Sequence, residues 1–181
     1  MAAGALRPMT RGLYLNRMAQ PLPSVAEAAS YVRAGAIVGL QTVLGEAGIT
    51  NGYPDIVTSV VPIQSGIAPS SRSVRVESAE FRFHAMPVRL LNDEAGLAED
   101  RLDPDVTYAR TSPEKALLDW IYLGESPRTR LAGPPFDLDF DLLDSRRLNR
   151  LAKRMALARE LESYLARCFK YSDRLESVQY T

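Results

Sequence analysis

Three charged residues that could line a site lie close together along the chain: Arg110, Lys115 and Asp119. Ser112 and Pro113 precede Lys115 and are typical of a helix start, because a serine can cap exposed N–H groups and a proline fits the first turn. Lys115 and Asp119 are therefore one helical turn apart. They could form an ion pair on the helix surface. Together with Arg110, they could instead line an anion site at the helix N-terminus.

The single histidine, His84, shares an alternating segment with Glu80 and Arg82, opposite the apolar Phe81 and Phe83. A histidine in this position could act as a general base, or it could be a structural or solvent-facing residue. The spacing identifies no serine or cysteine that would act as its nucleophile. Cys168, the single cysteine, is expected in the core. One histidine and one cysteine predict no structural metal site.

No glycine-rich loop leads into a helix with a following lysine, and the motifs of ordinary protein kinases are missing from the sequence. We therefore expect neither a conventional nucleotide-binding enzyme nor a bound cofactor.

Charged residues gather in three places that could contact a partner or could be solvated surface. Two clusters are acidic, and their members are Asp93, Glu94, Glu99, Asp100, Asp103 and Asp105 in the first and Asp137, Asp139, Asp141 and Asp144 in the second. The third is a basic stripe on an expected helix, made of Arg146, Arg147, Arg150, Lys153 and Arg154. Such a stripe can bind nucleic-acid phosphates, and Arg146, Arg150 and Arg154 would be its contacts.

The composition indicates an ordinary globular chain of 181 residues. Lys plus Arg and Asp plus Glu number 22 each, so nothing in the total charge attracts the protein to nucleic acid or to anionic lipid. The longest apolar run, 34–44, is far shorter than the roughly 20 residues that cross a bilayer. With no secretory signal pattern and one cysteine, we expect a cytoplasmic protein without membrane contact.

The elements that must position these residues alternate between helix and strand. We expect helices over 25–32, around 40–46 and from 113 onward, strands over 56–61, 72–77, 80–84 and 106–110, and a mobile loop over 62–73. The C-terminal part is amphipathic, with a break between Met155 and Ala158 because its apolar face rotates there. The fold class is therefore α+β, with a small mixed sheet flanked by helices and followed by C-terminal helices. Residues 1–23 form an arm, 24–135 the core, and 136–181 a helical part packed on the core.

Four segments in succession resemble the AbiEi-like antitoxin family, which includes the MenA-type antitoxins. They are GAIVGLQTVL at 35–44 followed by AGI at 47–49, YPDIVTSVVP at 53–62, FRFH at 81–84, and VTYARTSPEKALLD at 106–119. The resemblance implies a cognate nucleotidyltransferase-like toxin as partner. Many relatives carry a winged-helix DNA-binding domain ahead of this region. Here only residues 10–15 resemble the last strand of its wing, so nucleic-acid binding and autorepression are not expected.

The resemblance leaves two mechanisms of neutralisation open. In the first, the chain binds the toxin, and the contact candidates are Asp93 and Glu94 together with the aspartates at 137–144. In the second, it acts as an atypical serine protein kinase, or promotes self-phosphorylation of the toxin. ATP and magnesium would then be needed, with Arg110, Lys115 and Asp119 as the phosphate-handling groups. A DNA-binding regulator that uses the basic stripe is the third and weakest alternative.

Overall fold

The computed structural model describes residues 5–20, 22–51, 55–64, 70–76, 79–91 and 108–179. The first acidic cluster, Asp93 to Asp105, lies outside the described residues, as do residues 106 and 107 of the expected strand over 106–110. The second acidic cluster, the basic stripe and all three phosphate-handling candidates lie within them.

The central sheet is mixed, as the sequence predicted. Within the described residues it has the order β3-β4-β6-β5, in which β4 and β6 are parallel and the other neighbours are antiparallel. The bounds of these strands are β3 Ile37–Val38, β4 Ile56–Ile63, β5 Ser71–Val76 and β6 Ala79–Pro87. The interior strand β4 is a nearly continuous apolar run, which suits a strand covered on both faces.

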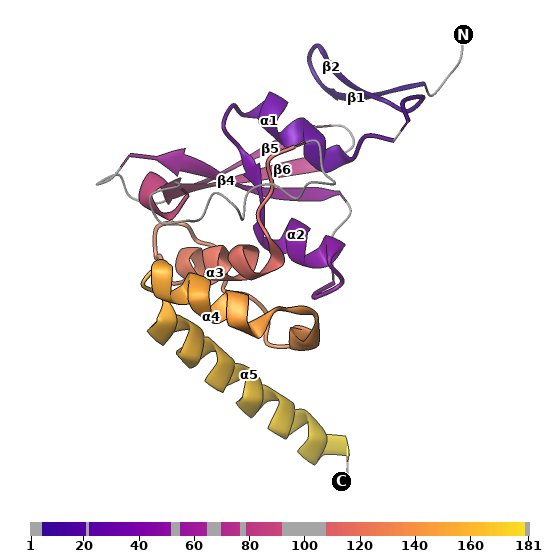
Figure 1. The fold of residues 1–181 in the computed structure, drawn as a ribbon. Helices are drawn as coiled ribbons and strands as arrows, with labels where there is room; N and C mark the ends of the chain where they lie inside the picture. The colour runs from indigo at the N-terminus through magenta and orange to yellow at the C-terminus, as the bar shows by residue number, and fades with distance from the viewer. Residues whose placement is uncertain are drawn as a thin grey trace.

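Helices cover both faces of this sheet (Figure 1). The short helices η1 (Val25–Ala28) and α1 (Ala29–Val32) lie on one side, and α2 (Leu40–Glu46), α3 (Pro113–Gly124) and α4 (Ser145–Arg154) lie on the other. The last helix, α5 (Ala158–Gln179), packs against α3 and α4 and then extends away from the body (Figure 1). The protein therefore has an α+β fold with helices at its C-terminal end.

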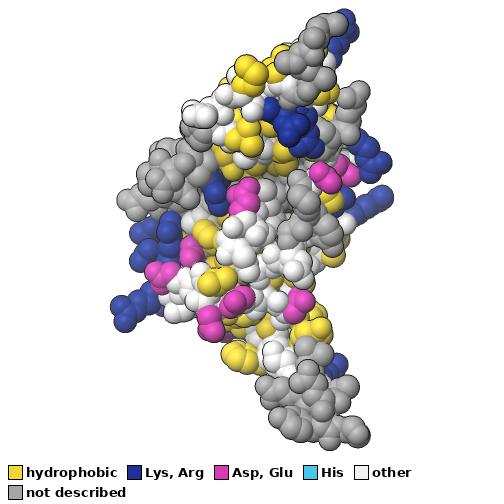
Figure 2. Space-filling view, turned by 90° about the vertical axis from the view of Figure 1, so that its right-hand side faces the viewer, with side chains coloured by type: hydrophobic (Ala, Val, Ile, Leu, Met, Phe, Trp, Pro, Cys, Tyr) yellow, Lys and Arg dark blue, Asp and Glu magenta, His cyan; other side chains and the backbone are white. Residues whose placement is uncertain are grey.

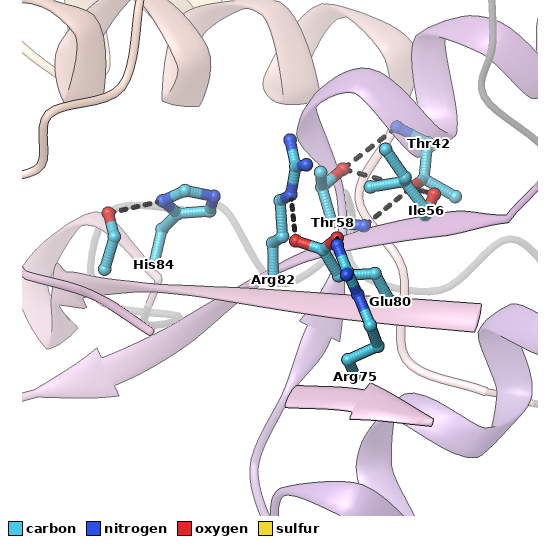
Figure 3. A network of polar contacts seen from close by, with 8 residues as sticks. Thr42, Ile56, Thr58, Arg75, Glu80, Arg82 and His84 are labelled. Carbon is cyan, nitrogen blue, oxygen red and sulfur yellow. Dashed lines mark hydrogen bonds and ion pairs between the residues drawn. The ribbon is translucent and has the colours of Figure 1, made fainter. Parts of the chain in front are cut away.

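Two threonines attach α2 to the sheet. The backbone N–H of Thr58 donates to Thr42 Oγ1 at 2.7 Å, and the N–H of Thr42 donates to Thr58 Oγ1 at 3.0 Å (Figure 3). The Thr58 hydroxyl also donates to the Gly39 carbonyl at 2.7 Å, just before α2 begins. This reciprocal bonding satisfies groups at the start of α2 and fixes the helix against β4.

The N-terminal arm is a two-stranded antiparallel hairpin of β1 (Leu6–Thr10) and β2 (Leu13–Asn16). The sequence indicated the second of these strands and missed the first. Figure 1 shows the hairpin at the edge of the molecule, above α1. Its Met9 side chain is buried and belongs to the main hydrophobic core.

The structure corrects three expected elements. The helix over 25–32 is a 3-10 turn followed by one short α-helix, and the Ser24 side chain makes no capping bond. The loop expected over 62–73 is shorter, since β4 continues to Ile63 and β5 begins at Ser71. In the part of 106–110 that the structure describes, only Arg110 forms a bridge, with Val38.

The break between the C-terminal helices is confirmed. Helix α4 ends at Arg154, and α5 begins at Ala158. Ala156 has a φ of 57°, a left-handed conformation that ends a helix. In the described parts of the chain, no helix has both the length and the apolar character that crossing a membrane would require.

Candidate functional site

Helix α3 begins as the sequence predicted. Ser112 caps it by accepting a hydrogen bond from the N–H of Lys115 at 3.3 Å, and Pro113 occupies the first turn. The helix is buried on more sides than expected, because α2, α4 and α5 all pack against it. Glu114, Lys115 and Asp119 are therefore buried together with the apolar residues of α3.

Lys115 and Asp119 form an ion pair through Nζ and Oδ1 in the protein interior. Their side chains are 2% and 0% exposed, so the pair belongs to the core and not to the helix surface, where the sequence placed it. Burial raises the pKa of Asp119 to about 6, and the Lys115 ammonium acts in the opposite direction. Asp119 Oδ2 is buried and accepts no hydrogen bond from the described residues.

Arg110 belongs to a different ion pair. Its guanidinium lies 3.2 Å from Glu46 Oε2 at the end of α2. Burial raises the pKa of Glu46, and Arg110 opposes that increase. The phosphate-handling candidates are thus divided between two ion pairs, Arg110 with Glu46 and Lys115 with Asp119. In this arrangement the Lys115 ammonium is enclosed and does not face solvent.

His84 has a serine partner that sequence spacing did not identify. Ser71 Oγ at the start of β5 lies 2.8 Å from His84 Nδ1, the contact drawn as a dashed line at His84 in Figure 3. The same hydroxyl lies 2.8 Å from the Thr129 carbonyl oxygen. When the hydroxyl donates to that carbonyl, it accepts from Nδ1–H of a neutral imidazole. Antiparallel pairing of Ser71 with His84 in the sheet is what brings them together.

His84 is a buried structural residue in this environment. Its side chain is 3% exposed, and burial lowers the pKa of His84 to about 4, with a further contribution from the charge of Arg82. Figure 3 shows Arg82 and His84 on the same side of β6. Arg82 extends to Glu80, and its Nε donates to Oε1 at 2.8 Å. The polar side of β6 expected from the sequence is thus present at Glu80 and Arg82, whereas at His84 it is covered.

The four aspartates of the second acidic cluster are exposed along the segment that leads into α4. Two of them have structural roles. Asp139 caps the 3-10 turn η5 (Phe140–Leu142) by accepting from the N–H of Asp141, and Asp144 caps α4 by accepting from the N–H groups of Arg146 and Arg147. These backbone bonds lower the pKa of Asp144. Asp137 and Asp141 make no capping bond to the described residues.

An apolar groove runs beside this segment and has a volume of about 530 Å³. Its walls come from the 136–143 segment, the first turn of α4 and the middle of α5, and they include Phe136, Phe140, Leu148, Leu165, Cys168 and Phe169. Hydrophobic side chains are intermixed with acidic ones on the lower part of the face in Figure 2. Asp137 and Asp141 are the acidic residues of the groove lining.

The basic stripe lies on the exposed side of α4. Arg146, Arg150, Lys153 and Arg154 are exposed, and Arg147 is half-buried, with its Nε 3.7 Å from Glu114 Oε2. Exposed basic residues on one side of a helix are typical both of a solvated helix face and of a phosphate-binding stripe. The geometry does not join the stripe to the α3 candidates, which are buried.

Sequence reasoning missed the groove, because its walls come from three segments whose apolar residues look like ordinary core positions. The exposure of Phe169 becomes visible only when α5 is placed against α4. Across the described ranges, no group of three or more His, Cys, Asp or Glu side chains is arranged to hold a metal ion. Comparisons with protein-family models, curated proteins and solved structures found no match.

Proposed function

We propose that this chain is the antitoxin of a bacterial toxin–antitoxin system of the phage-defence type, and that it acts in the cytoplasm. Its partner would be a nucleotidyltransferase-like toxin encoded nearby, which it neutralises by binding. The proposal starts from the four segments that resemble AbiEi-like antitoxins. Those segments include the strand β4, the middle of β6 and the start of α3.

The observation that supports binding is the surface beside α4, where an apolar groove adjoins exposed aspartates. A toxin that handles nucleotides and tRNA should present a basic surface around its active site. An acidic partner surface complements such a charge, steers the two proteins together and raises the association rate. Exposed apolar side chains next to it provide the area that a stable complex must remove from water.

The buried Lys115–Asp119 pair also favours binding over catalysis. A phosphoryl-transfer site needs cationic groups that reach the phosphate oxygens. Lys115 instead forms a buried ion pair with Asp119, and Arg110 forms an ion pair with Glu46. Phosphorylation of the toxin therefore becomes an outcome that the experiment must detect, with no observation from the described residues in its favour.

Native mass spectrometry of the toxin mixed with this protein, with ATP and magnesium present, tests the proposal. A stable complex that contains unmodified toxin is the expected result. Free toxin that gains the mass of a phosphoryl group only when this chain is present would replace binding by an enzymatic mechanism. The antitoxin function itself would be refuted by two results together. The mixture would contain neither a complex nor modified toxin, and expression of this chain would not restore the growth of cells that express the toxin.

A further inference from the structure

The groove between the 136–143 segment, α4 and α5 exposes more apolar surface than a solvated helix requires. Phe169, on the wall formed by α5, is 71% exposed. Phe136 and Tyr171 are each 38% exposed and contact each other through their rings, with 6.1 Å between the centroids. Large apolar side chains concentrated in one concave region are typical of a site that another protein covers.

The charged residues that line the groove are acidic, and the Arg167 guanidinium lies beside the lining, 5.8 Å from the centroid of the Phe136 ring. Asp137 and Asp141 line it, and none of its lining residues among the described part of the chain is a lysine or an arginine. Asp139 adds a third exposed carboxylate on the same segment. An occupant with positive charges beside its apolar side chains would be held here by complementary charge, whereas an acidic occupant would be repelled.

The chemistry of the walls also selects the occupant's backbone conformation. An extended strand entering a groove must find partners for its own N–H and C=O groups, as it does at a free sheet edge. The described lining of this groove comes from two helices, a 3-10 turn and the irregular segment before that turn, with mainly apolar side chains and no β-strand, so it presents no sheet edge. An α-helix satisfies its own backbone groups and needs only to contribute an apolar face.

We propose that the groove binds an amphipathic α-helix of the toxin, with apolar residues at helical spacing facing Phe136 and Phe169 and with Lys or Arg side chains beside Asp137 and Asp141. This inference rests on the proposed function, since it names the segment of the toxin that the antitoxin holds. It uses the two groove aspartates that make no capping bond to the described residues. It does not use Asp139 or Asp144, whose side chains cap η5 and α4.

Two matched pairs of variants test the proposal in the full-length protein. Phe169→Glu places a charge in the groove, and Tyr31→Glu changes a residue of equal exposure, 72%, on α1 at the other side of the sheet. Asp141→Lys reverses a groove charge, and Glu162→Lys makes the same change at an exposed position of α5 that does not line the groove. All four positions are exposed, so the variants should fold, which circular dichroism and urea unfolding verify.

The affinity of each variant for the purified toxin is measured by biolayer interferometry at two salt concentrations. Phe169→Glu and Asp141→Lys should each weaken binding at least about tenfold, with Tyr31→Glu and Glu162→Lys within about twofold of the wild type. The loss caused by Asp141→Lys should shrink at high salt. Replacing residue 169 by a photo-crosslinking amino acid should join it to a basic helical segment of the toxin.

Two outcomes separate the inference from the function on which it rests. If wild-type protein binds the toxin and the groove variants bind equally well, the groove assignment is wrong while the antitoxin function remains. If the wild type binds no toxin, the proposed function fails. A change in the mass of the free protein caused by Phe169→Glu, measured by analytical ultracentrifugation, would show that a second copy of this chain occupies the groove, and would overturn the inference.

Discussion

Lys115 and Asp119 lie one turn apart on α3 and pair with each other inside the protein, where neither side chain is more than 2% exposed. Residues of these types are rarely buried unless each has a partner. Their pairing allows α3 to be covered by α2, α4 and α5 while it carries two opposite charges. The same pair explains why Lys115, a candidate phosphate-handling group, is not on the surface.

Asp119→Asn should destabilise the fold strongly, because it leaves the Lys115 ammonium buried without an opposite charge. Breaking a buried ion pair in this way costs about 3–5 kcal/mol. The double variant Lys115→Met with Asp119→Leu removes both charges and fills similar volume, so it should recover most of that loss. Urea unfolding of the three proteins measures the difference. Equal stability of Asp119→Asn and wild type would show that the pair is not enclosed.

Lowering the pH should destabilise the protein through His84. Burial lowers the pKa of His84 to about 4 in the folded protein, whereas the unfolded chain has a value near 6.5. Above pH 6.5 both states are neutral, so His84 contributes no pH dependence there. Between pH 6.5 and 4 the unfolded state binds a proton that the folded state does not. The free energy of unfolding therefore falls as the pH falls, by about 3 kcal/mol in total.

His84→Asn isolates this contribution, because asparagine does not titrate and its amide can still contact Ser71 Oγ. The control is needed since Asp119, whose pKa is raised to about 6, has the opposite effect over part of the same range. The folded state binds the additional proton there, so Asp119 favours folding as the pH falls. The difference in the free energy of unfolding between wild type and His84→Asn should grow in magnitude from pH 7 to pH 4. A difference that is constant with pH would contradict the lowered pKa.

Ser112→Ala should cost about 1 kcal/mol of stability, because the N–H of Lys115 loses the acceptor that caps α3. Ser112→Asp keeps an acceptor and adds a charge that favours a helix N-terminus, so it should retain most of the stability. Thermal unfolding of the two variants beside wild type measures this. Similar losses for both substitutions would mean that packing around residue 112, and not the cap, matters.

Local sequence patterns predicted the elements well where one rule acts alone. The Ser112–Pro113 start of α3, the β-branched run of β4 and the rotation of the apolar face between Met155 and Ala158 are such cases. The failures have a common physical cause. The solvent exposure of a side chain depends on which other elements pack against it. The periodicity of one helix or strand contains no information about those neighbours. Lys115 was therefore expected on a helix surface, and His84 was placed beside Glu80 and Arg82 on the polar side of its strand with a structural role as one alternative, although other elements enclose both residues.

The candidate site was predictable only in part for the same reason. The aspartates at 137–144 could be named from composition, because a run of charged residues before a helix is visible in the sequence. Their division into capping and non-capping residues needed coordinates. Ser71 and His84 are 13 positions apart, and only the strand register brings the hydroxyl to the imidazole.

Gly124→Ala should destabilise the protein because the end of α3 touches another part of the backbone. A Cβ at Gly124 would stand 2.7 Å from the Cα and 3.1 Å from the nitrogen of Gly133, and backbone atoms cannot move aside as a flexible side chain can. Overpacking of this kind costs about 1–3 kcal/mol.

Gly133→Ala is the matched control, since a Cβ there meets nothing within 4 Å among the described residues and should change stability little. Urea unfolding of both variants tests the contact. If Gly124→Ala is as stable as Gly133→Ala, the backbone at Gly133 does not lie against Gly124. The segment before Phe136 would then be held by two hydrogen bonds, from Trp120 Nε1 on α3 to the Ala132 carbonyl and from the Tyr164 hydroxyl on α5 to the Pro135 carbonyl.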